Sequence, residues 1–181
     1  MPLVELVEGK LWEYENFLSK QEVFLLLGRA TNARESDWFE EDLDEHDMHH
    51  AGKTLQIGSL EPELVRRLNE RVAALFSDVK YMVPIGSIVR GSDKYHPTGF
   101  HRDNQDQETD SEHMYGVLMY LNNNFDGGEI CYPEIGIEYK PKPGVLLIHY
   151  AGNMHGVNPV SNGTRYSMTS FAVGLDSKVV G

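Results

Sequence analysis

The chain has 181 residues, a length suited to one sizeable domain that buries a core without disulfides. The formal net charge is −12 and no Lys/Arg-rich run occurs, which argues against a protein whose main task is to grip nucleic-acid phosphates. No apolar run reaches the ~18–20 residues of a membrane span, and residues 1–5 lack the basic start of a signal peptide. We therefore expect a cytoplasmic protein. Cys131 is the single cysteine, and we expect a small buried side chain without a disulfide partner.

The first 81 residues have a mixed pattern in which helices are prominent. Residues 11–18 predict a strand that leads into a turn, and Ser19 then stands where a helix N-cap would, with Glu22 as its capping-box partner. A second helix is expected to begin near Ser59, with an apolar stripe of Leu64, Leu68, Val72 and Leu75. We expect both helices to pack against a sheet and support it.

A long acidic loop is predicted at residues 31–53. Loops longer than ~12–15 residues without structure of their own are usually functional or disordered. Two interpretations stay open, a lid over an active site and a solvated insertion. The loop also contains His46, His49 and His50, which we expect to lie in solvent rather than to bind an accessory metal.

From about Met82 the pattern changes to short β-like runs separated by Gly, Pro and Asn, which is typical of a double-sheet jelly roll. The predicted strands are Met82–Val89, Met114–Leu121, Glu129–Tyr132, Gly136–Tyr139, Val145–Tyr150 and Arg165–Val173. We predict an α+β fold in one domain over residues 1–181. Residues 1–81 would form the N-terminal supporting helices and acidic loop, and residues 82–176 the double-stranded β-helix.

Three residues in the β-rich half form a pattern typical of a metal site. His101 and Asp103 stand two apart, so on an extended segment both side chains leave the same face. His155 can supply the third ligand, because a turn after the strand at 145–150 brings the chain back. Two imidazoles and one carboxylate without sulfur suit Fe(II), Mn(II) or Co(II), and such a site leaves three coordination positions open. The sequence therefore predicts a metal site at these three residues.

Arg165 follows ten residues after His155 and strengthens this interpretation. A His-x-Asp pair alone is a weak signal, but an arginine inside a barrel is costly without an anion. We expect it to pair with the carboxylate of an organic acid lying on the metal, the alternative being a surface ion pair. Among the other histidines, we expect His149 to be packed and hydrogen-bonded. His96 and His113 flank the predicted site, and we expect core or surface roles for them rather than a part in shaping its mouth.

Five motifs follow one another between Met82 and Val173. They are His101-Arg102-Asp103-Asn104, Tyr120-Leu121-Asn122, Gly127-Gly128-Glu129 with Tyr132-Pro133-Glu134, Lys140-Pro141-Lys142-Pro143-Gly144, and His155–Val160 with Arg165-Tyr166-Ser167. In this order they resemble the prolyl hydroxylase branch of the Fe(II)/2-oxoglutarate dioxygenases. The fourth motif resembles the collagen-type prolyl 4-hydroxylases, and the fifth resembles the oxygen-sensing prolyl hydroxylases.

The resemblance implies roles for individual residues. The three predicted ligands would hold Fe(II), and Arg165 would pair bidentately with the distal carboxylate of 2-oxoglutarate. The hydroxyls of Tyr120 and Ser167 would bind the same cosubstrate. Collagen-type enzymes place lysine where Arg165 stands, so the chain mixes features of two subgroups. Whether Tyr95 contacts the cosubstrate, as a tyrosine upstream of the His-x-Asp segment does in the oxygen-sensing enzymes, stays open.

The resemblance also implies a reaction and its partners. An enzyme of this branch uses Fe(II), 2-oxoglutarate and O2, with ascorbate as a candidate accessory reductant, and releases succinate and CO2 as it hydroxylates a C–H bond. The favoured substrate is a prolyl residue in a peptide or protein. A free amino acid, another side chain or a nucleobase remains an alternative within the enzyme class. Outside that class, a metal-binding jelly roll without oxygenase activity is the alternative, and it leaves Arg165 unexplained.

Overall fold

The computed structural model describes residues 3–40, 52–94, 98–104 and 112–181. Within these ranges the chain forms two α-helices, one 3-10 helix and a series of short strands. In chain order the elements are β1 (Val4–Val7), β2 (Leu11–Tyr14), α1 (Lys20–Asn32), η1 (Glu35–Asp37), β3 (Phe39–Glu40), β4 (Lys53–Gln56), α2 (Pro62–Ala73), β5 (Phe76–Ser77), β6 (Tyr81–Val83), β7 (Ser87–Ser92), β8 (His113–Tyr120), β9 (Asp126–Gly127), β10 (Ile130–Tyr132), β11 (Ile137–Tyr139), β12 (Leu146–Tyr150), β13 (Gly156–Val157), β14 (Val160–Asn162), β15 (Thr164–Val173) and β16 (Lys178–Val179).

One large antiparallel sheet organises the described part of the chain. Its order is β1-β2-β12-β8-β15-β7-β4-β3, and β6 also pairs with β15. The long strands β8 and β15 lie side by side from Ser167 opposite Tyr120 to Val173 opposite His113. Most residues of the central strands β12, β8 and β15 are buried, as expected for strands covered on both faces.

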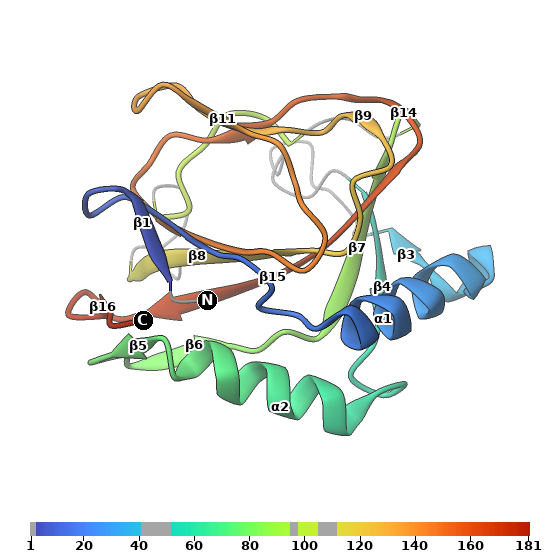
Figure 1. Cartoon of the computed structure of the whole chain (residues 1–181), viewed down its shortest axis with the longest axis horizontal. Helices are drawn as coiled ribbons and strands as arrows, with labels where there is room; N and C mark the ends of the chain where they lie inside the picture. Colours follow the sequence, from blue (N-terminus) through green and yellow to red (C-terminus); the bar gives the residue numbers. More distant parts are fainter. Residues whose placement is uncertain (1–2, 41–51, 95–97, 105–111) are drawn as a thin grey trace.

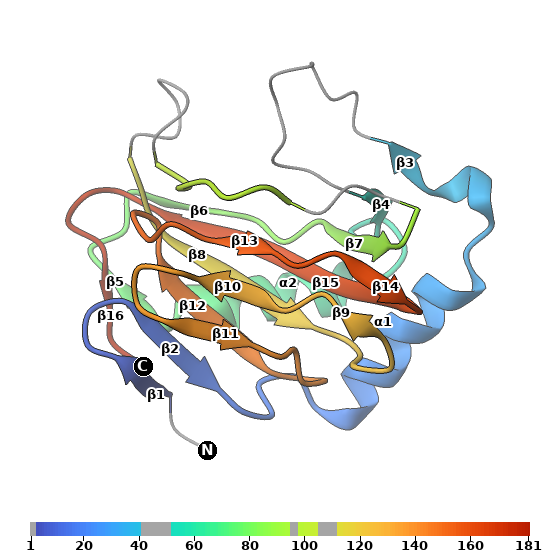
Figure 2. The same cartoon turned by 90° about the horizontal axis from the view of Figure 1, so that it is seen from above.

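Shorter strands form a second layer that faces this sheet. β11, β10 and β13 form one small sheet, and β14 pairs with β9. Figure 1 shows β9, β11 and β14 in one layer and β8 and β15 in the other. In Figure 2 the strands β10, β11 and β13 run across β12 and β8. Two facing antiparallel layers of this kind form a jelly roll, so the predicted α+β fold with a double-stranded β-helix is confirmed.

The helices pack on the outside of the large sheet, with α2 beneath it in Figure 1. The capping box at the start of α1 is confirmed, because Ser19 Oγ accepts a hydrogen bond from Glu22 N–H at 3.2 Å and the Glu22 carboxylate accepts one from Ser19 N–H at 2.7 Å. The predicted start of α2 near Ser59 is wrong by three residues. Pro62 is its first residue and Glu61 its N-cap, because the fixed φ and missing N–H of proline suit a first helical turn.

The predicted apolar stripe of the second helix is confirmed for Leu64, Leu68 and Val72, whereas Leu75 lies just beyond the C-cap of α2, Ala74. All four of its members are buried, and they pack in one hydrophobic cluster with residues of α1 and of the outer face of the large sheet. A second cluster lies between the two layers and is rich in tyrosine. We call it the interlayer cluster; its members are Leu11, Tyr120, Ile130, Tyr132, Tyr139, Val145 and Leu147.

Two features of the strand prediction need correction. The predicted strand Met82–Val89 is two strands, β6 and β7, because Pro84 between them has no N–H to donate to a ladder. The N-terminal third also supplies β1, β2, β3 and β4 to the large sheet, so its description as helical support with an acidic loop was incomplete. The single domain over residues 1–181 stays a prediction.

The predicted acidic loop is only partly described. Its first part contains η1 and β3, and β3 pairs with β4 at the end of the loop. Residues 41–51, with His46, His49 and His50, lie outside the described residues, so the lid stays untested.

The prediction that Cys131 is buried needs correction, because this residue is half-buried. Partial burial and the nearby Glu138 carboxylate raise the pKa of its thiol. Within the described ranges, no helix combines the length and apolar character needed to cross a membrane.

Candidate metal centre

The two predicted histidine ligands come together through their backbones. His101 N–H donates to the carbonyl oxygen of His155 and His155 N–H donates to that of His101, both at 2.9 Å, which forms an isolated antiparallel bridge. The N–H of Asp103 donates to the carbonyl oxygen of Ala151 at 3.0 Å. These bonds tie residues 98–104 to residues 151–155. Ligands far apart in the sequence are thereby fixed by main-chain hydrogen bonds and not by side-chain packing alone.

Each of these histidines has one ring nitrogen engaged with a backbone carbonyl oxygen. His101 Nδ1 lies 2.8 Å from Gly99 O, and His155 Nδ1 lies 2.9 Å from Asn153 O. A carbonyl oxygen only accepts, so each Nδ1 carries a proton, and in the neutral imidazole that binds a metal each Nε2 then presents its lone pair. Metal-binding histidines are generally oriented by a hydrogen bond of this kind.

The carboxylate of Asp103 lies against the Nε2 atoms of both histidines. Its Oδ1 is 3.3 Å from His101 Nε2 and 3.4 Å from His155 Nε2, and one ligand atom from each of the three residues falls within 4.8 Å of the others. Two ligand atoms about 2.1 Å from one ion lie about 3 Å apart when their bonds are perpendicular. The spacing therefore fits three donors around a single ion. The structure brings the predicted triad together.

The charge state of Asp103 follows from its neighbours. Burial opposes ionisation of its carboxyl group, but the polar contacts with the ring nitrogens of His101, His149 and His155 outweigh burial and hold its pKa well below the usual range. A carboxylate that stays ionised across the physiological pH range is the form that binds a metal. The donor set of two neutral imidazoles and one carboxylate fits Fe(II).

His149 is the packed, hydrogen-bonded histidine that the sequence predicts. It is 2 % exposed, and its Nε2 lies 2.7 Å from Asp103 Oδ2, the oxygen on the far side from the two ligand histidines. Its Nδ1 lies 2.9 Å from the hydroxyl of Tyr132. Burial lowers the pKa of His149, and the neighbouring His155 lowers it further. The sequence identified the packing of this histidine but not its partner, because β12 and residue 103 meet only in the folded chain.

Arg165 and Tyr120 form a second polar pair in the same interior. Arg165 is 7 % exposed and Tyr120 is fully buried, and the guanidinium carbon lies 5.3 Å from the centre of the tyrosine ring. The Nε of Arg165 and the hydroxyl of Tyr120 are both buried, and neither has a hydrogen-bond partner within the described residues. Burial raises the pKa of Tyr120, and the positive charge of Arg165 opposes that rise without reversing it. Two unsatisfied buried donors beside a buried cation fit a carboxylate ligand.

Ser167 completes the predicted cosubstrate residues. It is 2 % exposed and lies directly opposite Tyr120 across the β15–β8 ladder. Gly128 lies close to Arg165, since a Cβ there would stand 3.2 Å from Arg165 Cδ and 2.8 Å from the Phe125 ring, in a backbone conformation with φ +68°. A glycine is therefore needed beside this arginine.

The interlayer cluster joins the two polar sites. The ring of Tyr132 lies 5.9 Å from that of His155 between centroids, and Tyr132 packs in the same cluster as Tyr120. The metal triad and the Arg165–Tyr120 pair are thus parts of one interior between the two strand layers. Tyr120 also stacks on Tyr139, with centroids 6.3 Å apart.

An ion pair on the outside ties the two ligand-bearing segments together. Arg102, between two of the predicted ligands, pairs with Glu134 and donates to Gly152 O. Glu134 also accepts a hydrogen bond from Met154 N–H at 3.3 Å. The Arg102 side chain therefore leaves the segment on the side away from His101 and Asp103, as the alternation of side chains along an extended segment requires.

The remaining predicted residues divide into two groups. His113 flanks the site as predicted: its Nδ1 lies 3.2 Å from the backbone oxygen of Asp103, and its ring stacks on Phe171. His96 and Tyr95 lie outside the described residues, so the question of a contact between Tyr95 and the cosubstrate stays open.

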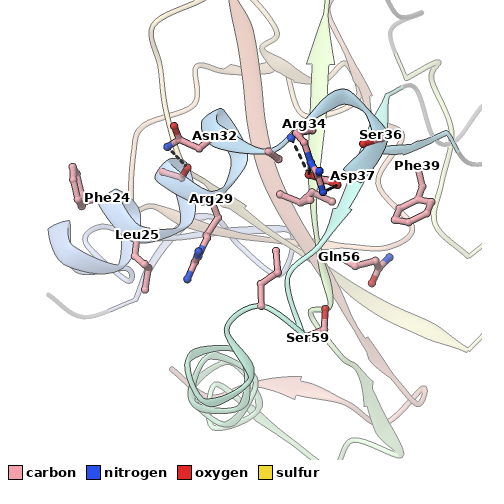
Figure 3. A pocket seen from close by; sticks show the side chains of 14 residues that line it. Phe24, Leu25, Arg29, Asn32, Arg34, Ser36, Asp37, Phe39, Gln56 and Ser59 are labelled. Atoms are coloured by element: carbon pink, nitrogen blue, oxygen red, sulfur yellow. Dashed lines mark hydrogen bonds and ion pairs between the residues drawn. The ribbon is translucent and has the colours of Figure 1, made fainter.

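A groove elsewhere on the surface is separate from this centre. It has a volume of about 770 Å³ and lies between α1, η1, β3, β4 and the loop before α2. Figure 3 shows Phe24 and Leu25 on α1 at one end of this groove and Phe39 at the other. None of the predicted metal or cosubstrate residues lines it.

Comparisons with known proteins give matches in structure but not in sequence. No family sequence model matches the chain, and no curated protein matches it. A prolyl hydroxylase from Trichoplax adhaerens, solved in complex with a peptide fragment of the hypoxia inducible factor oxygen degradation domain, has a TM-score of 0.65 and 18% identity. The match covers 92% of this chain and 84% of that chain.

Two bacterial structures are similar to the same extent. A prolyl-4-hydroxylase from Pseudomonas putida has a TM-score of 0.61 and 16% identity, over 91% of this chain and 92% of that one. An oxidoreductase of the 2OG-Fe(II) oxygenase family from Burkholderia pseudomallei has a TM-score of 0.64 and 16% identity, over 96% and 90%. At these identities the comparisons show a shared fold. The resemblance inferred from the motifs is confirmed at that level, and the His-x-Asp…His triad is present.

Proposed function

We propose that this chain is an Fe(II)- and 2-oxoglutarate-dependent oxygenase that hydroxylates a prolyl residue in a peptide or protein. The observation that carries the oxygenase assignment is the pairing of two sites in one interior. Three convergent donors suit Fe(II), and a buried arginine and tyrosine beside them have unsatisfied donors that suit a carboxylate. A metal-binding jelly roll without a cosubstrate would account for the first site but not for the second.

The metal would be held by His101, Asp103 and His155. The hydrogen bonds from both Nδ1 atoms to backbone oxygens orient the two imidazoles so that, when neutral, each would present its Nε2 lone pair to the metal, and Asp103 would supply the negative charge. Fe(II) held by three protein ligands supplies the O2-activating chemistry of this enzyme class, with positions left open for cosubstrate and O2. The protein contributes orientation and exclusion of water by the largely buried surroundings of the triad.

The cosubstrate would be oriented by Arg165, Tyr120 and Ser167. The guanidinium supplies the charge and the fork geometry that a carboxylate prefers. The Tyr120 hydroxyl, which has no partner within the described residues, would donate to the same group. Because all three side chains are buried, the bound carboxylate would be shielded from water, where its ion pair with arginine is strongest.

A prolyl substrate is supported by the motifs and by two of the structural neighbours. The Trichoplax and Pseudomonas proteins are both named prolyl hydroxylases, and the first was solved with a peptide. We propose a proline-containing peptide segment as the partner of this chain, and ascorbate as an accessory reductant.

One reaction tests both parts of this function. The purified protein is supplied with Fe(II), ascorbate, 2-oxoglutarate and a pooled library of proline-containing peptides, and mass spectrometry follows succinate and the gain of one oxygen on peptides. We expect both signals, with the oxygen on proline. Succinate with oxygen on another residue, or on no peptide, would contradict the prolyl substrate and keep the oxygenase. Neither signal, in protein shown to bind Fe(II), would contradict the oxygenase.

A further inference from the structure

His149 stands between a predicted metal ligand and a buried tyrosine. Its Nε2 is 2.7 Å from Asp103 Oδ2 and its Nδ1 is 2.9 Å from Tyr132 Oη, which makes a continuous chain of three side chains. Tyr132 is fully buried and His149 is 2 % exposed. None of the five sequence motifs includes position 149, and the roles implied by the resemblance do not involve it.

The direction of each hydrogen bond follows from its chemistry. An ionised carboxylate only accepts, so His149 Nε2 carries a proton and donates it to Asp103 Oδ2. In a neutral imidazole the other nitrogen then accepts, so the Tyr132 hydroxyl donates to Nδ1. The hydrogen bond from Tyr132 therefore favours the neutral tautomer of His149 with its proton on Nε2, which is the tautomer that can donate to Asp103.

The hydrogen bond between His149 and Asp103 needs a residue without a side chain at position 116. A Cβ on Gly116, in the neighbouring strand β8, would lie 2.3 Å from His149 Nε2 and 2.8 Å from Asp103 Oδ2. Such distances are far shorter than a carbon can approach these atoms without displacing them. Glycine at position 116 is thus a condition of the His149–Asp103 hydrogen bond.

The two oxygens of Asp103 have separate partners. Oδ1 faces the Nε2 atoms of His101 and His155, where the ion would lie, and Oδ2 faces His149. A carboxylate held this way offers one oxygen to a metal and is prevented from turning both oxygens toward it. One-oxygen binding keeps the remaining positions open.

We propose that His149 is a positioning residue that fixes Asp103 for one-oxygen binding of the metal, and that Tyr132 fixes His149 in turn. This role presupposes the triad and so rests on the proposed function. Removing outer partners of a metal ligand typically weakens metal binding about 10- to 100-fold. We expect a loss of that size for His149→Leu and a smaller loss for Tyr132→Phe. His149→Gln, which keeps an N–H donor, should retain part of the affinity.

Mn(II) binding gives a readout that does not depend on turnover. Bound Mn(II) loses the electron paramagnetic resonance signal of the free ion, so a titration of the full chain yields the dissociation constant. Wild type, His149→Leu, His149→Gln and Tyr132→Phe are compared. Tyr115→Phe is the control, because it removes the hydroxyl of a buried tyrosine that belongs to the other hydrophobic cluster, the one that contains the α2 residues. Thermal unfolding of the metal-free proteins establishes that each variant is folded.

The outcomes distinguish a failure of the positioning role of His149 from a failure of the metal site itself. Weaker Mn(II) binding in His149→Leu and Tyr132→Phe, but not in Tyr115→Phe, supports the positioning role. Equal affinity in wild type and in folded Tyr132→Phe and His149→Leu overturns it and leaves the proposed function standing. If His149→Leu does not fold, Tyr132→Phe alone decides between these two results. No Mn(II) binding by wild type would overturn the metal site itself.

Discussion

The two polar sites inside the barrel differ in how completely their groups are satisfied. At the metal triad, the Asp103 carboxylate accepts a hydrogen bond from His149, and each ligand histidine is anchored to a backbone oxygen. At the Arg165–Tyr120 pair, two buried donors have no partner in the described part of the chain. The first site is built by the protein alone, whereas the second is complete only with an anion.

This difference indicates what each site contributes. Buried polar groups are rarely left unpaired, and each one costs stability. A preformed triad needs no rearrangement to take an ion, so its residues should control whether metal binds at all. A site with unsatisfied donors is stabilised by its ligand, so its residues should control cosubstrate affinity while the metal still binds. The following variants test that division, from the largest expected effect to the smallest.

Asp103→Ala should abolish both metal binding and turnover. The variant removes the only anionic member of the triad and leaves three histidines, two of them buried, around the space that it vacates. Succinate formation and Mn(II) titration measure the two effects, and Asp176→Ala at an exposed position serves as the control. Metal-dependent succinate formation by folded Asp103→Ala would show that the ion binds elsewhere.

Arg165→Leu should raise the 2-oxoglutarate requirement while Mn(II) affinity stays at the wild-type level. Removing one partner of a buried charge pair costs about 2–5 kcal/mol, which corresponds to roughly 30-fold or more in affinity. Arg165→Lys keeps the charge but loses the fork, and should lose about tenfold, equivalent to about 1.5 kcal/mol for one charge-assisted bond. Cosubstrate KM in both variants is the measurement. An unchanged KM in Arg165→Leu would show that the arginine does not bind the cosubstrate.

Tyr120→Phe should change stability and cosubstrate affinity in opposite directions. The hydroxyl is buried and has no hydrogen-bond partner in the described ranges, so its removal should leave the free energy of unfolding unchanged or raise it by up to about 1 kcal/mol. Loss of its hydrogen bond to a carboxylate should weaken 2-oxoglutarate binding by about 1.5 kcal/mol, or roughly tenfold. Chemical denaturation and cosubstrate titration are compared on the same sample. A parallel loss of stability and affinity would indicate a purely structural hydroxyl.

Glu134→Gln should have the smallest effect. Its ion pair with Arg102 joins the two ligand-bearing segments, but the Glu134 side chain is 47% exposed, and exposed ion pairs contribute little. The main-chain bonds between His101 and His155 remain in the variant. We therefore expect Mn(II) affinity to fall by no more than about twofold to threefold. A loss of Mn(II) affinity as large as that of His149→Leu would show that the ion pair between Arg102 and Glu134, and not the backbone bridge between His101 and His155, holds the three ligands in position.

The sequence predicts the elements whose signals are local. The capping box at Ser19, the apolar stripe of α2 and the strands with flanking turns are all encoded within a few residues. The strand prediction fails where pairing decides the outcome. The segment around Lys53–Gln56 forms an inner strand of the large sheet because β7 and β3 lie beside it, and its four residues alone carry little pattern.

The site shows the same limit. His101, Asp103, His155 and Arg165 could be predicted because their residue types and order suit one chemistry. The partner of His149 could not be predicted, because Asp103 is 46 residues away and the contact exists only across packed layers. Gly116 gives no signal in the sequence, since its importance lies in the atoms that a side chain there would displace.

The most direct test of the account is an anaerobic titration of the Fe(II)-loaded protein with 2-oxoglutarate, followed by visible absorption. A 2-oxo acid that chelates Fe(II) gives a charge-transfer band, which neither component gives alone. We predict that the band appears in wild type, is absent in Asp103→Ala, and appears in Arg165→Leu only at much higher 2-oxoglutarate concentrations. Absence of the band in wild-type protein that has bound Fe(II), or an identical titration for Arg165→Leu, would contradict the claim that these two sites form one oxygenase centre.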